Sequence, residues 1–344
     1  MLTERELIAF IAKGHAGARP VRGDIGIGDD CAVLRVGRSR LLVTTDLVTE
    51  GIHFDLAYAP PYFIGRKAVA AALSDIAAMG GAPRGVFVSV AVPAARGGRF
   101  ALALAEGIHD EAIAAGVPVL GGDTSASAGP VFLDVTVLGE ASARGPVMRS
   151  GARPGDVLYV SGALGASALG LRLMRKGLRP WSWKAWSRLL AKSEEKRARA
   201  RAPLLAALAH LHPHPRLALG GILSRRRIAT AMIDISDGLS TDLHNLCDAS
   251  RVGARIEESS LPLHEALSIE PRHALRLALG GGEDYELLFT TRPARKDAVA
   301  RAAREAGISL TPIGRITASR GKVLLVGRDG RAQPLPRGGY EHFR

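Results

Sequence analysis

Seven aspartates set the strongest condition on how this chain folds, because they lie in short segments rich in glycine or serine. The segments read GIGDDCAV, TTDLVTEGIHF, LSDIAAMG, GGDTS and IDISDGL. If folding gathers the carboxylates, two of them about 4 Å apart repel each other by on the order of 4 kcal/mol at an effective dielectric constant near 20. Such a cluster needs cations, and ligands that are all oxygen favour Mg²⁺, Mn²⁺ or Ca²⁺ over zinc. The aspartates are Asp29, Asp30, Asp46, Asp75, Asp123, Asp234 and Asp237.

Length and composition indicate a globular protein of two domains. The chain has 344 residues, of which 47% are hydrophobic and 23% charged, as in ordinary globular proteins. Its two cysteines, Cys31 and Cys247, give neither a disulfide framework nor a paired metal-ligand spacing. Charged residues interrupt the N-terminal segment where a signal peptide would be apolar, and no run of about 18 uncharged apolar residues occurs. We therefore expect a soluble cytoplasmic protein without a membrane span.

The formal net charge of +13 raises the question of a nucleic-acid partner. Residues 172–201 hold eleven Lys or Arg against two Glu, a net charge of +9, which leaves +4 for the rest of the chain. The same segment holds Trp181, Trp183 and Trp186. These tryptophans could stack on bases or lie on an anionic membrane surface. The simpler interpretation, which we favour, is a solvated helical insertion whose tryptophans pack on their own domain. We therefore expect no nucleic-acid partner unless this segment provides the contact.

Helix-like and strand-like segments alternate along the chain, which indicates α/β or α+β layers. A turn at Pro154-Gly155 marks the start of a second unit. We expect domains at 1–148 and 149–344, the second with the basic insertion at about 172–201. The first domain is expected to hold helices at 4–12, 63–79 and 99–115 and strands ending at Asp46 and at 85–92, 117–120 and 131–138.

Asp75 is the aspartate most difficult to explain as a structural residue. It lies inside an expected helix, in a run without other charge from 68 to 82. Aspartate is a poor residue for a helix interior, and an unpaired buried carboxylate is costly. A cation or an N–H partner must offset that cost, and we favour the cation.

The remaining acidic motifs allow both structural and functional interpretations. Gly-Asp-Asp at 28–30 is a common turn, and Asp46 could cap a following helix. Asp123 follows an apolar strand, where α/β proteins place ligands. Asp234 and Ser236 would share one face of a strand, while Asp237 could cap the next helix. No P-loop, protein-kinase motif or nucleophile elbow occurs. Prolines interrupt the His-rich segment 210–216, which indicates a rigid connector rather than a metal site.

In this order, the motifs resemble those of the thiamine-monophosphate kinase family, in the superfamily that includes aminoimidazole ribonucleotide synthetase and selenophosphate synthetase. The resemblance runs essentially from end to end. Selenophosphate synthetase is disfavoured because no Cys-Lys loop lies near the N-terminus, and aminoimidazole ribonucleotide synthetase by GGEDYEL and GGYEHF. Other ATP-dependent enzymes of the superfamily remain the nearest alternative. The matching segments are 26–34, 44–54, 66–80, 121–124, 149–156, 233–243, 281–289 and 338–343.

The resemblance implies two α/β-type domains, the first pairing with its copy to form a shared barrel in a homodimer. It also implies transfer of the γ-phosphoryl group of ATP to the phosphate of thiamine monophosphate, with several Mg²⁺ ions. A phosphate acceptor is already ionised near neutral pH, because its second pKa is about 6, so no general base is needed. By resemblance, the metal ligands are Asp30, Thr44, Thr45, Asp46, Asp75, Asp123, Asp234 and Asp237. The ATP contacts are Gly122, Asp123, Arg149 and Ser236, and the thiamine contacts are His53, Glu283 and Tyr340. Asp29 has a supporting role.

Two features depart from the family pattern. Ala72 stands where the family usually has an asparagine, so a supporting hydrogen bond is expected to be missing. The basic segment at 172–201 is outside the pattern, and the resemblance implies no role for it.

Overall fold

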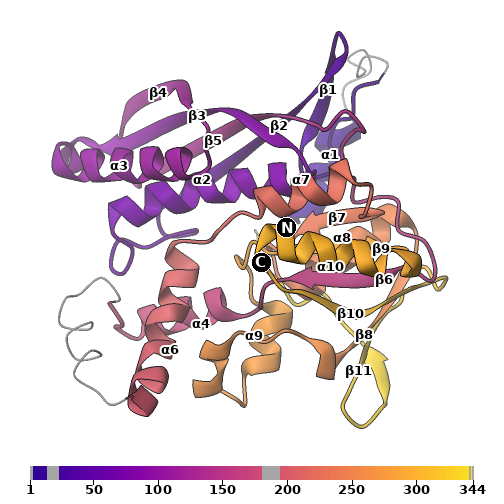
Figure 1. Ribbon diagram of the computed structural model, residues 1–344. Coiled ribbons are helices and arrows are strands. Elements are labelled where there is room, and N and C mark those ends of the chain that lie inside the picture. The colour runs from indigo at the N-terminus through magenta and orange to yellow at the C-terminus, as the bar shows by residue number, and fades with distance from the viewer. Residues whose placement is uncertain (1–2, 14–22, 180–193, 341, 343–344) are drawn as a thin grey trace.

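Two mixed β-sheets, each covered by helices, make up the part of the chain that this computed structural model describes, residues 3–13, 23–179, 194–340 and 342. The first sheet has five strands in the order β1-β2-β5-β3-β4, and the second has seven in the order β12-β11-β8-β10-β6-β9-β7. In Figure 1 the five-stranded sheet lies at the top, with α2 and α3 beneath it. The layered α/β fold expected from the sequence is confirmed.

The first sheet is formed by residues with the alternation that one covered face requires. Along β5, Leu133, Val135 and Val137 are buried, and the residues between them are less so. These buried side chains meet α2 and α3, while the other face of the sheet is open. The strands are β1 (Ala32–Val36), β2 (Ser39–Thr49), β3 (Ala82–Pro93), β4 (Val119–Ser127) and β5 (Phe132–Glu140), and the helices of this half are α1 (Glu4–Lys13), α2 (Pro61–Ala78) and α3 (Arg99–Ala114).

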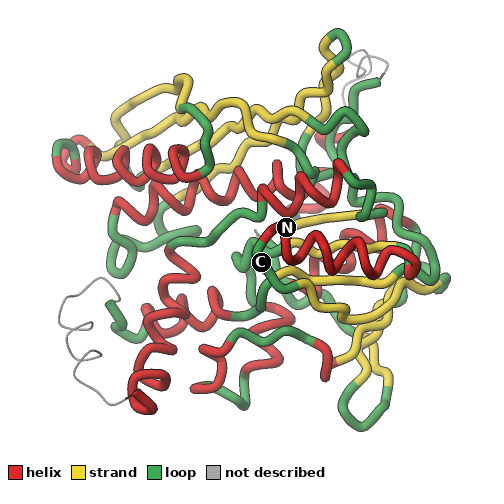
Figure 2. Tube along the Cα trace, viewed as in Figure 1, coloured by secondary structure: helices red, strands yellow, loops and turns green. Residues whose placement is uncertain are grey.

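The second sheet is packed between helices, as Figure 2 shows in red and yellow. Its inner strands β6 and β9, and the edge strand β7 beside β9, are buried along almost their whole length. The strands are β6 (Val157–Ser161), β7 (Ala231–Asp234), β8 (Gly253–Glu257), β9 (Leu287–Thr291), β10 (Leu310–Thr317), β11 (Val323–Val326) and β12 (Ala332–Pro334). The helices are α4 (Ala166–Arg175), α6 (Glu194–Leu211), α7 (Leu217–Arg225), α8 (Leu239–Ser250), α9 (Ala274–Gly280) and α10 (Lys296–Ala306), and short 3₁₀ helices lie at Ala94–Arg96, Glu258–Ser260, Glu265–Ile269 and Pro293–Arg295.

Helix α2 joins the two halves. Besides the first sheet, it contacts α3, α6, α7 and β7. Most of its residues are buried and many of these are small, so the helix is covered on nearly all sides. The proposed domain boundary near residue 148 remains a prediction.

The predicted bounds of the strand at 117–120 are wrong. It begins at Val119 and continues to Ser127, paired in parallel with β3. Gly122 permits this pairing, because its φ is +148° and a Cβ there would lie 1.9 Å from the Val88 carbonyl oxygen. Asp123 therefore lies within a strand and not after its end.

The tryptophans of the basic segment lie outside the described residues. The described parts of this segment include the end of α4 and the first turns of α6. The helical insertion and its two alternatives, a nucleic-acid surface and a membrane surface, therefore remain predictions. In the described part of the chain, no helix combines the length and the apolar character needed to cross a membrane.

Candidate active site

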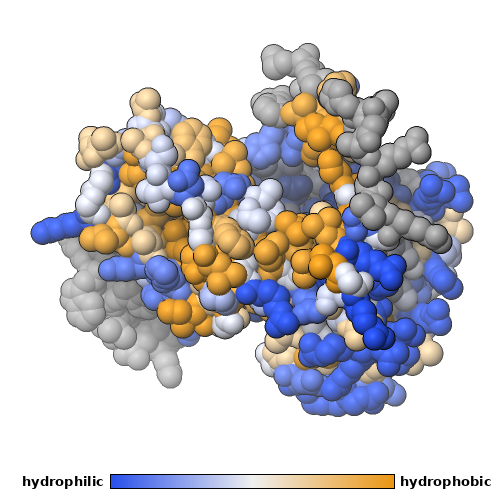
Figure 3. Space-filling model, turned by 90° about the horizontal axis from the view of Figure 1, so that it is seen from above, coloured by the Kyte–Doolittle hydropathy of each residue, from blue (hydrophilic) through white to orange (hydrophobic). Residues whose placement is uncertain are grey.

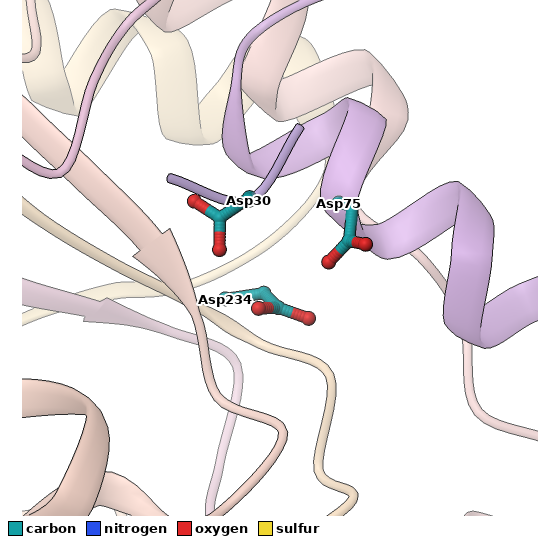
Figure 4. A group of neighbouring side chains, drawn as sticks. All are labelled: Asp30, Asp75 and Asp234. Atoms are coloured by element: carbon teal, nitrogen blue, oxygen red, sulfur yellow. The ribbon is translucent and has the colours of Figure 1, made fainter. Parts of the chain in front are cut away.

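Three of the predicted aspartates meet at the junction of the two halves. Asp30 comes from the loop before β1, Asp75 from α2 and Asp234 from the end of β7. One carboxylate oxygen from each lies within 4.8 Å of the others, and Figure 4 shows the side chains directed toward a common space. Asp30 is 8% exposed and Asp234 is 2% exposed. The cluster is thus built from three distant parts of the sequence and is largely removed from water.

Hydrogen bonds orient each of the three carboxylates. The Thr44 hydroxyl donates to Asp75, and Ser74 Oγ donates to Asp234 Oδ2 over 2.7 Å. Arg149 Nη2 donates to Asp30 Oδ1 over 2.7 Å. The second oxygen of Asp30, Oδ2, is buried without a hydrogen-bond partner among the described residues.

The electrostatics of the cluster favour the binding of positive charge. Burial, and then the charges of Asp46, Asp234 and Asp30, raise the pKa of Asp75 well above its usual value. Burial and the charge of Asp30 raise the pKa of Asp234 to about 7. All the donor atoms are oxygens and one of them is an unsatisfied buried atom, which are the properties of a site for a hard divalent cation. The residues present therefore fit a metal such as Mg²⁺.

Strand β2 places two of its predicted ligands beside the cluster and one away from it. Thr44 faces inward, and Asp46 is close enough to raise the pKa of Asp75. Burial and the charge of Asp134 raise the pKa of Asp46 to about 6. Thr45 faces the open side of the sheet, where its hydroxyl donates to Asp134 over 2.9 Å. The side chain of Thr45 is thus not part of the aspartate cluster.

Asp123 also lies apart from the three central aspartates. Its neighbour Gly122 pairs with Val88, Val88 pairs with Val135, and Val135 pairs with Asp46. Gly122 is therefore on the same face of the sheet as Asp46. Asp123, one residue further, is exposed and faces the open side. Its Oδ1 accepts the backbone N–H of Thr124 over 2.9 Å.

A cavity of about 470 Å³ adjoins the aspartates. Arg149 lines it and also binds Asp30, which connects the cavity to the cluster. Asp29 supports this arrangement, because its carboxylate accepts the backbone N–H of Arg149 at 3.0 and 3.2 Å. The volume is in the range of small-molecule and cofactor sites. Other lining residues are Gly28, Ser236, Asp237, Asp242, Asn245, Arg337 and Tyr340.

Capping of the next helix, the structural alternative considered for Asp237, is not what the structure shows. The N-cap position of α8 is Gly238, and the carboxylate of Asp242 accepts the backbone N–H groups of Asp237 and Gly238 over 3.1 and 3.0 Å. Asp237 itself lines the cavity. Asp242 was not among the predicted residues, although an acidic residue in the first turn of a helix is a sequence signal for this role.

The three predicted thiamine contacts are linked to one another, and Tyr340 connects them to the cavity. His53 interacts electrostatically with Glu283, and its ring lies 5.2 Å from that of His342. The His342 ring lies 4.9 Å from that of Tyr340, which is itself half exposed. Burial and then the charge of His342 lower the pKa of His53.

Two residues that sequence reasoning missed bind Glu283. Lys67 Nζ lies 2.6 Å from Glu283 Oε1, and His210 Nδ1 lies 3.2 Å from Oε2. The interpretation of 210–216 as a connector is wrong for His210, which lies buried in the last turn of α6. Helix α6 ends at Leu211, before Pro213, so the prolines affect only the residues after it.

Comparisons with known proteins agree with this architecture. The model of the AIR synthase related protein, N-terminal domain, matches residues 28–141, and that of the C-terminal domain matches residues 153–327. The chain is 35% identical over 340 residues to thiamine-monophosphate kinase of Escherichia coli K12, covering 97% of each protein. It is 32% identical over 322 residues to that of Bacillus subtilis, covering 93% of this chain and 94% of the relative.

A solved structure described as AaThiL complexed with AMPPCP and TMP is also similar, with a TM-score of 0.81 and 30% identity, covering 99% of this chain and 97% of that one. The family models, the identity and the shared fold all extend across both halves of the molecule. The chain therefore belongs to the thiamine-monophosphate kinase family, within the AIR synthase related proteins.

Proposed function

We propose that this chain transfers the γ-phosphoryl group of ATP to the phosphate of thiamine monophosphate, which gives thiamine diphosphate. The observation that carries the proposal is the buried cluster of Asp30, Asp75 and Asp234 beside a cavity lined by Arg149 and Ser236. The names of the relatives support it, as does the solved relative described as complexed with AMPPCP and TMP.

We propose Mg²⁺ as the ion at this cluster, with Thr44 and Asp46 beside the three aspartates. Bound there, Mg²⁺ supplies positive charge to the phosphate oxygens and offsets the charge that develops in phosphoryl transfer. Ligation by Thr45, Asp123 and Asp237 remains a prediction. ATP contact by Gly122 also remains a prediction.

The protein residues bind and orient the two substrates. Arg149, fixed by Asp29 and Asp30, presents a guanidinium to the cavity for a phosphate group. His53, Glu283 and Tyr340 hold the thiamine part, with an aromatic face and a negative charge suited to a cationic ring. The acceptor phosphate arrives ionised, so the residues need to align it with ATP rather than remove a proton.

A direct assay tests this function. Purified protein is incubated with ATP, Mg²⁺ and thiamine monophosphate, and the products are separated by chromatography. We expect thiamine diphosphate to form, its formation to stop in EDTA, and no product with thiamine, which offers a hydroxyl in place of the phosphate. Absence of thiamine diphosphate with Mg²⁺, Mn²⁺ and Ca²⁺ alike would contradict the proposal.

We also propose that two copies pair through the open face of the five-stranded sheet. Leu34, Val36 and Leu47 on this face are 42%, 57% and 57% exposed. Figure 3, which views the molecule from above this sheet, shows hydrophobic residues across the face. Exposed apolar surface of this kind marks interaction sites. Sedimentation analysis is expected to show a dimer, and Leu47→Lys is expected to shift it toward monomer.

A cytoplasmic location is proposed from the two cysteines. Cys31 and Cys247 are both buried and unpaired, as expected of a protein in a reducing compartment.

A further inference from the structure

We infer that Lys67 and His210 are positioning residues that hold Glu283 in place for the thiamine substrate. This inference rests on the proposed function, because Glu283 acts on thiamine only if thiamine monophosphate is the substrate. Lys67 and His210 lie 143 residues apart in the sequence, and neither was predicted as a site residue.

The three side chains form a closed triangle, in which the Glu283 side chain is 26% exposed. Lys67 Nζ lies 2.6 Å from Glu283 Oε1 and 3.2 Å from His210 Nε2, and His210 Nδ1 lies 3.2 Å from Glu283 Oε2. Lys67 is 7% exposed and His210 is 2% exposed. Each oxygen of the Glu283 carboxylate thus has its own nitrogen partner, which fixes the orientation of the carboxylate plane.

The triangle also determines where the histidine proton lies. The Lys67 ammonium has three donors and no acceptor, so His210 Nε2 must accept from it. His210 therefore carries its proton on Nδ1, next to Glu283 Oε2 and to Ser167 Oγ at 3.0 Å. Burial and then the charge of Lys67 lower the pKa of His210 to about 3, which agrees with a neutral ring. Burial acts to raise the pKa of Glu283, but its partners, with the Lys67 charge foremost, lower it overall, so the carboxylate remains ionised.

The backbone at Glu283 is also held, by hydrogen bonds and in an uncommon conformation. Glu283 has a φ of +65°, an uncommon conformation for a residue with a side chain. Its N–H donates to the Ser236 carbonyl over 2.7 Å, and the N–H of Tyr285 donates to that of Ile235 over 2.9 Å. The loop is thereby attached to the residues that follow Asp234, while its side chain is attached to α2 and α6.

Helix α2 connects this triangle to the aspartate cluster. Lys67 and Asp75 are both on α2, and their spacing in sequence corresponds to about 12 Å along a helix. Glu283 is thus held at a fixed distance from the aspartates that would hold the ATP phosphates. We expect the triangle to set the position of thiamine monophosphate relative to ATP and to leave ATP binding unchanged.

The test compares Lys67→Met and His210→Leu with variants that retain a donor, Lys67→Arg and His210→Asn. Asparagine can present an N–H near the position of Nδ1.

The Michaelis constant for each substrate and kcat are measured with Mg²⁺, together with the melting temperature. We expect KM for thiamine monophosphate to rise about 10- to 100-fold in Lys67→Met and His210→Leu, as for the loss of a hydrogen bond to a charged group. KM for ATP should change less than about twofold, and His210→Asn should recover most of the loss. Lys322→Met, at an exposed lysine in the second half, is the matched control.

Two results would overturn the inference: an unchanged KM for thiamine monophosphate, or a parallel loss for both substrates with a lower melting temperature. The latter would mean a purely structural role. A wild-type protein that forms no thiamine diphosphate would instead contradict the proposed function. The triangle itself is then tested by ¹⁵N NMR of the histidine rings, where His210 should show a protonated Nδ1 and an unprotonated Nε2. A protonated Nε2 would contradict the assigned contacts.

Discussion

Asp30 has two carboxylate oxygens in different situations. Oδ1 accepts from the Arg149 guanidinium, whereas Oδ2 is buried without a hydrogen-bond partner in the described part of the chain. A buried polar atom without a partner costs about 1–3 kcal/mol, and more when it is charged. Burial of the Asp30 carboxylate raises its pKa, although the charge of Arg149 opposes this shift. A bound cation would satisfy Oδ2 and remove the repulsion among the aspartates, so the same residues that destabilise the metal-free protein would select the metal.

Replacing Asp75 by asparagine tests this balance at one residue. The amide side chain would keep an acceptor for the Thr44 hydroxyl and remove one charge from a buried group of carboxylates. We expect Asp75→Asn to raise the melting temperature in EDTA and to abolish the increase caused by Mg²⁺. Activity should fall about 100-fold or more, because metal binding contributes several kcal/mol to charge stabilisation. Glu106→Gln, on the exposed side of α3, is the control. Full activity with an unchanged response to Mg²⁺ would mean that Asp75 does not bind the ion.

At Gly122 the absence of a Cβ atom permits the close approach of β4 to β3. A Cβ there would lie 1.9 Å from the Val88 carbonyl oxygen, at a φ of +148°. Gly116 also has a positive φ, +67°, but no atom lies within 4 Å of its Cβ position. We expect Gly122→Ala to lower the free energy of unfolding by about 2–5 kcal/mol, from overpacking and backbone strain together. Gly116→Ala should cost about 1–2 kcal/mol, from backbone strain alone. Urea denaturation measures both, and equal losses would show that contact with β3 is not the cause.

Helix α2 is positioned by glycines that let backbones approach each other. Cβ atoms at Gly65 and Gly107 would lie 2.2 Å from the Leu104 carbonyl oxygen and 1.9 Å from that of Tyr62. The axes of α2 and α3 are therefore close, and any added atom must separate the helices. Since α2 carries both Lys67 and Asp75, its position affects both sides of the candidate active site.

The variant Gly107→Ala tests how much the close packing of α2 on α3 matters for the position of α2. We expect it to lower the free energy of unfolding by about 1–3 kcal/mol, the usual cost of overpacking. Because α2 would be displaced from β7, activity should decrease as well. Gly129→Ala, in a loop with open space at the Cβ position, should change the free energy of unfolding by less than about 1 kcal/mol. Chemical denaturation and the product assay provide the two readouts.

The sequence predicted elements better than it predicted which side chains face each other. The uncharged run around Asp75 indicated a buried helix, and apolar runs indicated most strands of the first half. The continuation of β4 beyond Leu120 was not predictable, because the pairing with β3 depends on a close approach at Gly122. The outward direction of Thr45 follows from the register of β2, which the motif alone does not contain. Lys67 and His210 carry no local signal, since their contact spans 143 residues.

At the scale of the molecule, a basic protein surrounds an acidic site. The formal net charge is +13, yet the cluster between the two halves consists of aspartates with one arginine, Arg149, bound to them. The stability of the metal-free protein therefore depends on the ionisation of a few buried groups and not on the overall charge.

The pH dependence of stability follows from the direction of these shifts. In the metal-free protein, the pKa of Asp29 and of Asp46 is raised to about 6, and that of Asp234 to about 7, from a usual value near 3.8. The folded state therefore holds protons that the unfolded chain releases, and the stability from these groups is complete below about pH 4 and lost as the pH rises through about 6 to 7. For Asp234, which is 2% exposed, a shift of this size is on the order of 4 kcal/mol. Glu283 and Glu111 are shifted in the opposite direction, and the effect of their pKa shifts is confined to lower pH.

We therefore expect the melting temperature in EDTA to fall as the pH rises from about 6.5 to about 8, because the lowered pKa values of His53 and His210 act in the opposite direction only below about pH 6.5. Mg²⁺ competes with protons for the same carboxylates, so its stabilising effect should be larger at about pH 8 than at about pH 5.5. Differential scanning calorimetry at both pH values, with EDTA or with Mg²⁺, measures the four melting temperatures. Asp75→Asn should lose the Mg²⁺ effect at both pH values, whereas Glu106→Gln should behave as the wild type. A stabilisation by Mg²⁺ that is independent of pH would show that the ion binds elsewhere, because binding to the cluster must displace the protons that its raised pKa values retain.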